Sequence, residues 1–192
     1  MKDLEEFLEE AHRRYGHRCA GQILGIRMSL AGLRDLGLDP RESRERLVTF
    51  VEIDRCATDA IELVTGCRLG RRTLKFRDYG IMAATFVDLE EHRAVRVLTR
   101  DDARESALAY FPDAPDPTTA QRQAYRTMPE AQLFTIEPVS VELGPWDLPG
   151  PTRRKVVCAA CAQVVRDGKE VWVEGRPLCK PCAGGAYFQR LP

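Results

Sequence analysis

The chain has 192 residues, of which 44% are hydrophobic and 30% are charged, and its formal net charge at pH 7 is zero. This composition is typical of a globular protein, and the length allows one well-packed domain with a small appendage while excluding two full-sized domains. No apolar run approaches the roughly 20 residues that a membrane-spanning helix needs, so we expect no partnership with a membrane.

The N-terminal residues 1–16 are acidic and amphipathic, and they lack the apolar core of a secretory signal peptide. Without an export signal, the seven cysteines indicate a reducing compartment, where thiols bind metals or take part in chemistry more often than they form disulfides. We therefore expect a cytoplasmic protein.

Hydrophobic spacing predicts an amphipathic helix over residues 3–14, a break at Tyr15-Gly16 and a second helix over residues 20–36 that ends at Gly37. Small residues recur along the second helix at intervals of three or four, at Gly21, Gly25, Ser29 and Gly32. Glycine at this frequency weakens an isolated helix, so we expect this face to pack very closely against another element. A buried strand over 47–53 and a short helix over 58–65 are predicted next.

The middle of the chain alternates apolar and polar residues in several short segments, predicted as strands over 74–77, 83–88 and 94–98. The last two form a hairpin around a polar turn. Helices over 103–110 and 119–125 follow, and then an extended segment over 133–143, which Pro138 either restricts to a sheet edge or splits. This order of elements predicts an α+β domain, with helices packed on a largely antiparallel sheet.

A linker is predicted over residues 144–152, which contain three prolines and two glycines. It separates an α+β domain over 1–143 from a small C-terminal domain over 153–192. From Arg153 onward there are eight Lys/Arg residues against three Asp/Glu. This mild positive charge falls short of the dense basic patch of a nucleic-acid binder, so nucleic acid is not the partner that we expect.

Four cysteines of the C-terminal domain form two Cys-x2-Cys pairs with seventeen residues between them: Cys158, Cys161, Cys179 and Cys182. This spacing is typical of a tetrahedral zinc site, and four thiolates close the coordination shell, which makes the site structural. A redox-active cysteine pair and an iron–sulfur cluster are the alternatives. Because so small a domain cannot bury enough apolar surface to fold alone, we predict a zinc ribbon whose metal supplies folding free energy.

A second group of cysteines lies in the first domain. His17 and Cys19 are two positions apart, so in an extended segment their side chains face the same way. Cys56 stands at the entrance of a predicted helix, where the helix N-terminus favours a thiolate. These three residues are candidates for a second transition-metal site, with zinc as the expected ion, or for catalytic groups built on an activated thiol. Cys67, just past a helix end, is predicted to be an inert buried thiol.

Three blocks of sequence occur in a fixed order, over residues 15–21 (YGHRCAG), 56–70 (CATDAIELVTGCRLG) and 74–80 (LKFRDYG). They resemble the HGHxCPG, CxxDAIQxxTGCTxG and LxFxDYGK segments of the FmdE family, the E-subunit family of formylmethanofuran dehydrogenase. The resemblance covers residues 12–90, and a C-terminal four-cysteine ribbon also occurs in that family. Two residues depart from the pattern, because Tyr15 replaces a histidine and Ala20 replaces a proline.

The resemblance implies an α+β core in a homodimer, with a metal-binding cleft in which His17, Cys19 and Cys56 are the ligands or reactive groups. It also implies an association with molybdenum or tungsten oxidoreductases, without an established reaction for the domain itself. Because a tyrosine binds metal only weakly at neutral pH, Tyr15 is not expected to replace the family histidine in full.

Two functions agree with these patterns. In the first, three protein ligands hold a metal ion with an open coordination position, as catalytic zinc sites do. Asp54, Asp59 and Asp78 are then candidate bases or partners of the ligands, although carboxylates in turns and first helical turns are often merely solvated. Lys75, Arg77 and Tyr79 are candidates to contact a small anionic ligand, or they form a solvent-facing row on a strand.

In the second function, the ribbon is an adaptor that binds another protein or nucleic acid without catalysis. Basic and aromatic residues suited to such contacts are Arg153, Arg154, Lys155, Trp172, Arg176 and Lys180. Trp172 has an alternative role in the small core of the ribbon itself.

Overall fold

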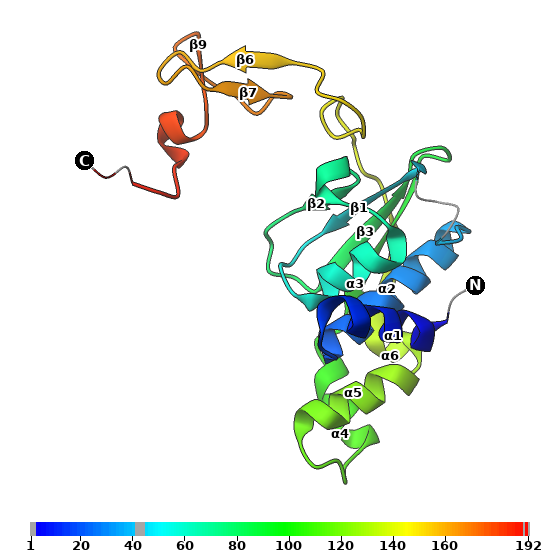
Figure 1. Cartoon of the computed structure of the whole chain (residues 1–192). Coiled ribbons are helices and arrows are strands. Elements are labelled where there is room, and N and C mark those ends of the chain that lie inside the picture. The colour runs from blue at the N-terminus through cyan, green and yellow to red at the C-terminus, as the bar shows by residue number, and fades with distance from the viewer. Residues whose placement is uncertain (1–2, 41–44, 190, 192) are drawn as a thin grey trace. The chain divides into compact units, whose positions relative to one another are not determined.

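The computed structural model describes residues 3–40, 45–189 and 191 (Figure 1). The chain divides into two compact units, Met1–Glu142 and Leu143–Pro192. The N-terminal unit holds the helices and the large sheet, and the C-terminal unit holds the two Cys-x2-Cys pairs.

Two helices open the N-terminal unit, α1 (Leu4–Tyr15) and α2 (Ala20–Leu36). A capping box starts α1, because the Asp3 carboxylate accepts the Glu6 N–H at 2.9 Å and the Glu6 carboxylate accepts the Asp3 N–H at 3.0 Å. Gly16 ends α1 with a φ of 73°, a left-handed conformation that glycine adopts without strain. The chain then reverses into α2, as the predicted break requires.

The sheet has five strands in the order β2-β1-β3-β4-β5. They are β1 (Leu47–Val51), β2 (Leu74–Phe76), β3 (Ala83–Asp88), β4 (Arg93–Thr99) and β5 (Phe134–Val139). β1 and β2 are parallel and are joined through α3 (Cys56–Thr65) and the short turn η2 (Leu69–Arg71), whereas the other neighbours are antiparallel. The predicted α+β fold with a largely antiparallel sheet is confirmed.

Helix α2 packs on β3 and β4, α3 packs on β1, and α1 packs on the other two helices (Figure 1). Their apolar residues and the inward-facing side chains of β1, β3 and β4 form one core. Gly32 of α2 lies directly over the Phe86 ring of β3, where a Cβ atom would approach the ring to 2.3 Å. The glycine therefore lets the helix lie close to the sheet, as the small-residue spacing predicts.

A helical insertion separates β4 from β5. It contains α4 (Ala103–Tyr110), α5 (Pro117–Thr127) and the single turn α6 (Glu130–Leu133), and α4 and α5 lie side by side in Figure 1. β5 is an edge strand, so Pro138 removes no hydrogen bond from the middle of the sheet, as expected.

Several boundaries differ from the predicted ones. The helix expected from residue 58 begins at Cys56, since the Thr58 N–H already donates to the Arg55 carbonyl at 2.7 Å. The first strand ends at Val51 instead of residue 53. The last extended segment is shorter than residues 133–143, because α6 occupies its start and the regular pairing ends at Val139.

The C-terminal unit consists of two small hairpins followed by one turn of helix. β6 (Lys155–Val157) pairs with β7 (Val164–Arg166), β8 (Val171–Val173) pairs with β9 (Arg176–Leu178), and η3 (Pro181–Gly185) follows. Glu174 and Gly175 join β8 to β9 with φ values of 49° and 74°, as a two-residue hairpin loop requires. The predicted small four-cysteine ribbon is thus confirmed.

Within the described ranges, every helix is too short or too polar to cross a lipid bilayer.

Candidate metal centres

The N-terminal ends of α2 and α3 lie side by side because glycines of α2 let the two helices pack closely. A Cβ atom built on Gly25 of α2 would lie 2.4 Å from the carbonyl oxygen of Ala57 in α3, so only glycine permits this distance between the backbones. One turn earlier, a Cβ atom on Gly21 would make an ordinary contact, 3.6 Å from Cys56 Cβ. This packing places the first turns of both helices together.

Cys19 and Cys56 occupy these two helix starts. Cys19 is the N-cap of α2, with an extended backbone (φ −133°, ψ 162°), and Cys56 is the first residue of α3. His17 lies in the loop that leads into α2. One ligand atom from each of His17, Cys19 and Cys56 lies within 4.8 Å of the other two. The structure therefore brings together the three residues that the sequence pattern indicates, and we call them the His17–Cys19–Cys56 cluster.

The protonation of the cluster follows from its contacts. A hydrogen bond with His17 lowers the pKa of the Cys56 thiol, and the same bond raises the pKa of His17. Burial raises the pKa of Cys19, although backbone N–H groups at the start of α2 act in the opposite direction. Cys56 is therefore the thiol of the pair that is more readily ionised.

The orientation of His17 depends on Tyr15. His17 Nδ1 lies 3.1 Å from the Tyr15 carbonyl oxygen, which can only accept a hydrogen bond. Nδ1 is then the protonated nitrogen of a neutral imidazole, and Nε2 is the nitrogen that carries the lone pair. A ring held in this way presents one defined nitrogen to a ligand.

The Tyr15 side chain itself points to α3. Its hydroxyl donates to the Asp59 carbonyl oxygen at 3.0 Å, and burial raises the pKa of the phenol. Where the family pattern has a histidine, this chain therefore has a residue that ties the end of α1 to α3.

The three acidic residues considered as assistants are exposed, namely Asp54, Asp59 and Asp78. Of these, Asp59 acts on the cluster, because its negative charge contributes to the raised pKa of His17. None of the three belongs to a group that could hold a metal within the described residues.

Arg77 and Tyr79 line a separate cavity of about 220 Å³. The Arg77 guanidinium lies over the Phe50 ring, 5.1 Å from its centre, and the carboxylates of Glu52 and Glu142 also line this cavity. It therefore lacks the positive charge that suits an anion. Lys75, half-buried on β2, lies outside its lining.

Cys67 is 1% exposed, and the Thr49 hydroxyl lies 3.4 Å from its sulfur. Burial raises the pKa of this thiol. Both observations agree with the predicted inert thiol of the core.

The four cysteines of the ribbon form the second cluster, in which the ligand atoms of Cys158, Cys161, Cys179 and Cys182 all lie within 4.8 Å of one another. The Cys161 and Cys179 sulfurs are 3.7 Å apart. A backbone N–H at Cys179 lowers the pKa of Cys158 to about 6, whereas hydrogen bonds with neighbouring thiols raise the pKa of Cys182 to about 12. Crowding of four thiols around one point is the arrangement of a tetrahedral metal site.

Aromatic and apolar side chains of the ribbon face solvent. Trp172 is 56% exposed, so it does not serve as the core of the ribbon. Glu170 is a buried charged group of this unit, and Arg154 pairs with it at 2.9 Å.

A cavity of about 230 Å³ adjoins the first cluster through Cys19. Its lining includes Arg18 from the loop before α2 and Arg122 and Arg126 from α5. The sequence patterns did not single out these arginines. The one sequence feature that could have indicated them is the spacing of four between Arg122 and Arg126, which places both on one face of a helix.

Comparison with known proteins shows to which family the chain belongs. The model of a family described as FmdE, molybdenum formylmethanofuran dehydrogenase operon, matches residues 14–137. The chain belongs to the FmdE family. The matched region contains the whole His17–Cys19–Cys56 cluster and ends before the ribbon.

Two individual proteins are similar to this FmdE family member. A tungsten formylmethanofuran dehydrogenase FmdE-like protein from Syntrophus aciditrophicus, known from a crystal structure, has a TM-score of 0.63 at 20% identity, over 98% of this chain and 96% of that chain. At this identity the likeness shows the fold alone. A protein of Archaeoglobus fulgidus, described as a probable S-adenosyl-L-methionine-binding protein, is 34% identical over 111 residues, which are 56% of this chain and 30% of that protein. This chain therefore matches less than a third of that relative.

Proposed function

We propose that this FmdE family member is a metalloprotein with a structural zinc ion in the ribbon and a second transition-metal ion, zinc, in the His17–Cys19–Cys56 cluster. In the second site the ion keeps one coordination position open to a ligand. The single observation that carries this proposal is the meeting of one imidazole and two thiols within 4.8 Å, at the starts of two helices.

The chemistry of these residues fits zinc. Two cysteines and one histidine are a ligand set that catalytic zinc sites use, with a fourth position left for water or a substrate group that the ion polarises. His17 directs Nε2 away from the Tyr15 carbonyl, and the hydrogen bond with His17 favours the thiolate form of Cys56. In the ribbon, by contrast, four thiolates leave no open position, so the role proposed there is structural.

Metal analysis of the chain, purified without added metal, tests this proposal. We expect about two ions per chain, and about one in a His17→Ala, Cys19→Ala double variant that keeps its helical circular dichroism. His12→Ala is the matched control, because this exposed histidine lies near the end of α1 and outside both clusters. Cys158→Ser should remove the other ion.

A value of about one ion in both the wild type and the double variant would overturn the second site. It would favour the alternative in which the ribbon is an adaptor and the N-terminal unit has no metal chemistry.

The family description also supports a wider proposal. It names the operon of a molybdenum formylmethanofuran dehydrogenase, so we infer that this protein acts alongside a molybdenum- or tungsten-dependent oxidoreductase. Co-purification of the tagged chain with such an enzyme from its native cells tests the association. The homodimer that the resemblance implies stays a prediction, which light scattering of the purified chain tests.

A further inference from the structure

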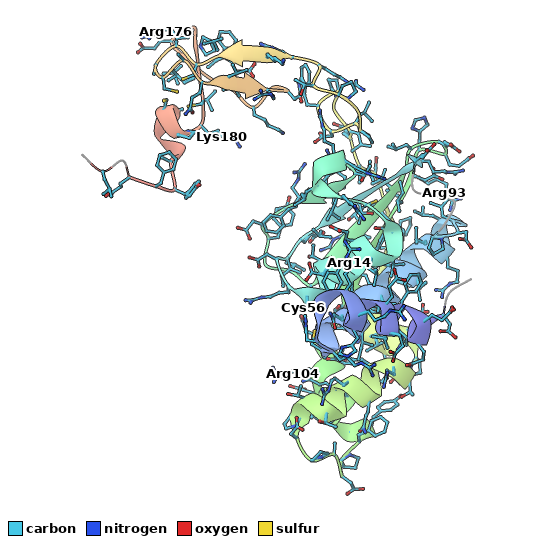
Figure 2. All side chains as sticks on the ribbon, viewed as in Figure 1. Arg14, Cys56, Arg93, Arg104, Arg176 and Lys180 are labelled. Atoms are coloured by element: carbon cyan, nitrogen blue, oxygen red, sulfur yellow. The ribbon has the colours of Figure 1, made fainter. Side chains whose placement is uncertain are left out.

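Three arginines from distant parts of the chain meet beside Cys19. Arg18 precedes α2, and Arg122 and Arg126 lie one turn apart on α5. Together they line the cavity of about 230 Å³, and among the residues that the structure describes none of those that line it is acidic. Figure 2 labels Cys56 at the start of α3 and Arg104 on neighbouring α4. Cys19 of the cluster is itself one of the residues that line the cavity. The cavity thus belongs to the same region as the cluster.

The floor of the cavity is apolar. Leu8 of α1 and Ile23 of α2 contribute to the lining, and each is 4% exposed. Thr119, at the start of α5, adds a hydroxyl that accepts a hydrogen bond from Arg122 at 3.0 Å. Cationic groups over an apolar floor favour a ligand with an anionic head and a short apolar body.

The existing partners of the arginines do not cancel this charge. Arg18 pairs with Glu9 at 2.6 Å and Arg126 pairs with Glu5 at 2.8 Å, but both carboxylates are more than half exposed and lie outside the cavity lining. Exposed pairs of this kind contribute little free energy, and a guanidinium has five N–H donors of which a pair uses one or two. Within the described residues Arg122 has no carboxylate at ion-pair distance. The nearby Asp116, whose pKa is lowered by hydrogen bonds from Thr119 and more weakly by the Arg122 charge, lies outside the cavity lining.

The proposed metal does not need these charges either. A divalent ion with two thiolates and a neutral imidazole has a formal charge of about zero. The ion therefore needs no neutralisation by the three arginines of the neighbouring cavity. Their positive charges remain available to bind another anion.

We propose that this cavity binds a small organic carboxylate, with its head on Arg122 and its neighbours and its body over Leu8 and Ile23. Such a ligand would lie beside Cys19 and hence within reach of the open position of the metal. The inference deepens the proposed metal centre and rests on it for the role of the ligand, whereas binding itself depends on the arginines.

Butyrate is the probe that we choose, because it joins a carboxylate to a three-carbon apolar chain. Binding is followed in the full chain, as purified, from the arginine Nε–H resonances in ¹H–¹⁵N spectra. We expect a Kd of about 1 mM, given the few atoms of the probe. Butyramide, a neutral molecule of the same shape, should bind about tenfold more weakly, because it forfeits the charged hydrogen bonds.

Variants locate the binding. Arg122→Gln and Arg126→Gln should each weaken butyrate about tenfold, whereas Arg104→Gln, an exposed arginine of neighbouring α4, should not change it. Using both cavity variants keeps the test informative if one of them unfolds. Equal binding of butyrate and butyramide, or an unchanged affinity in folded Arg122→Gln and Arg126→Gln, would overturn the inference. Tighter binding of inorganic phosphate than of butyrate would show that the cavity prefers phosphate to carboxylate. That result would overturn the proposed ligand class.

The two proposals can fail separately. Metal content and butyrate binding are therefore both measured on the wild-type chain. If butyrate binds while the wild type contains about one ion, the cavity stands and the second metal site falls. If the wild type contains about two ions and butyrate does not bind, the metal centre stands and the anion cavity falls.

Discussion

Gly25 of α2 lies directly against the backbone of Ala57 in α3, at a distance that leaves no room for a side chain. A Cβ atom at position 25 would lie 2.4 Å from the Ala57 carbonyl oxygen and 2.9 Å from its Cα atom. This contact sets the distance between the two helices and so between Cys19 and Cys56 at their starts. The stability of the fold and the geometry of the candidate metal site are coupled at this position.

We expect Gly25→Ala to destabilise the N-terminal unit by about 1 to 3 kcal/mol, because the rigid α3 backbone cannot give way to the added methyl group. The same change should lower the occupancy of the cluster, since the helix starts move apart. Urea unfolding followed by circular dichroism measures the first effect. Gly21→Ala is the matched control for stability, because its methyl group would make only ordinary contacts at 3.6 Å or more. Equal stability of the two variants would contradict the argument.

Tyr15 offers a test of whether its side chain serves the metal or the packing. Tyr15→Phe removes the hydrogen bond from the phenol to the Asp59 carbonyl, and should lower the free energy of unfolding by about 1 kcal/mol. The number of bound metal ions should not change, because the contact with His17 Nδ1 comes from the Tyr15 carbonyl. Loss of an ion in this variant would instead show that the phenol is needed at the site.

We expect the carboxylate of Asp88, at the end of β3, to contribute to the free energy of unfolding in a way that is lost in acid. Its side chain is 1% exposed, Arg46 Nε donates to it at 2.9 Å, and the Glu90 N–H donates at 3.0 Å. These contacts, the Arg46 guanidinium first, hold the pKa of the carboxyl below its ordinary value. The unfolded chain then binds the proton more readily. The contribution is complete above the unfolded pKa of about 3.9 and is lost as the pH falls toward the lower folded pKa.

Asp88→Asn should therefore cost about 3 kcal/mol near pH 7, since it removes one partner of a buried pair, and less near pH 3. Urea unfolding at both pH values provides the comparison. Asp102→Asn, which removes the carboxylate of an exposed pair with Arg100, should have little effect at either pH. A cost for Asp88→Asn that is the same at pH 7 and pH 3 would show that its charge contributes nothing.

Removal of metal should affect the two units differently. With a chelator, we expect the amide protons of β6–β9 to exchange freely, because the ribbon has short strands and little buried apolar surface of its own. The amides of β1 and β3, which are buried along their whole length, should keep their protection. Hydrogen exchange followed by mass spectrometry resolves the two regions. Ribbon amides that stay protected without metal would contradict a structural role for the ion.

Local patterns were sufficient to predict much of this protein. The helical spacing of apolar residues, the glycine breaks and the alternating strands all act through neighbours a few residues away, so helices and strands appear close to where they were expected. Element ends were predicted less well, as at Cys56, because a terminal hydrogen bond such as that of Thr58 leaves little trace in hydrophobic spacing. The four cysteines of the ribbon also needed no tertiary information, since their two turns bring the thiols together at short range.

Contacts between distant segments were decided only by the tertiary structure. His17 and Cys19 lie far from Cys56 in sequence, and the packing of Gly25 against Ala57 is what unites them. The residues alone made these three side chains candidates for one site, and the resemblance to a family supported that prediction, but neither gave the distances between them. Arg122 and Arg126 line the same cavity as Cys19, although about a hundred residues separate them from it in the sequence. No local spacing predicts that these residues are close together. By itself, the sequence determined the elements and the ribbon cluster, because both rest on local geometry. The tertiary structure decided which charged and ligating groups share one cavity, because that depends on how close two helices can pack.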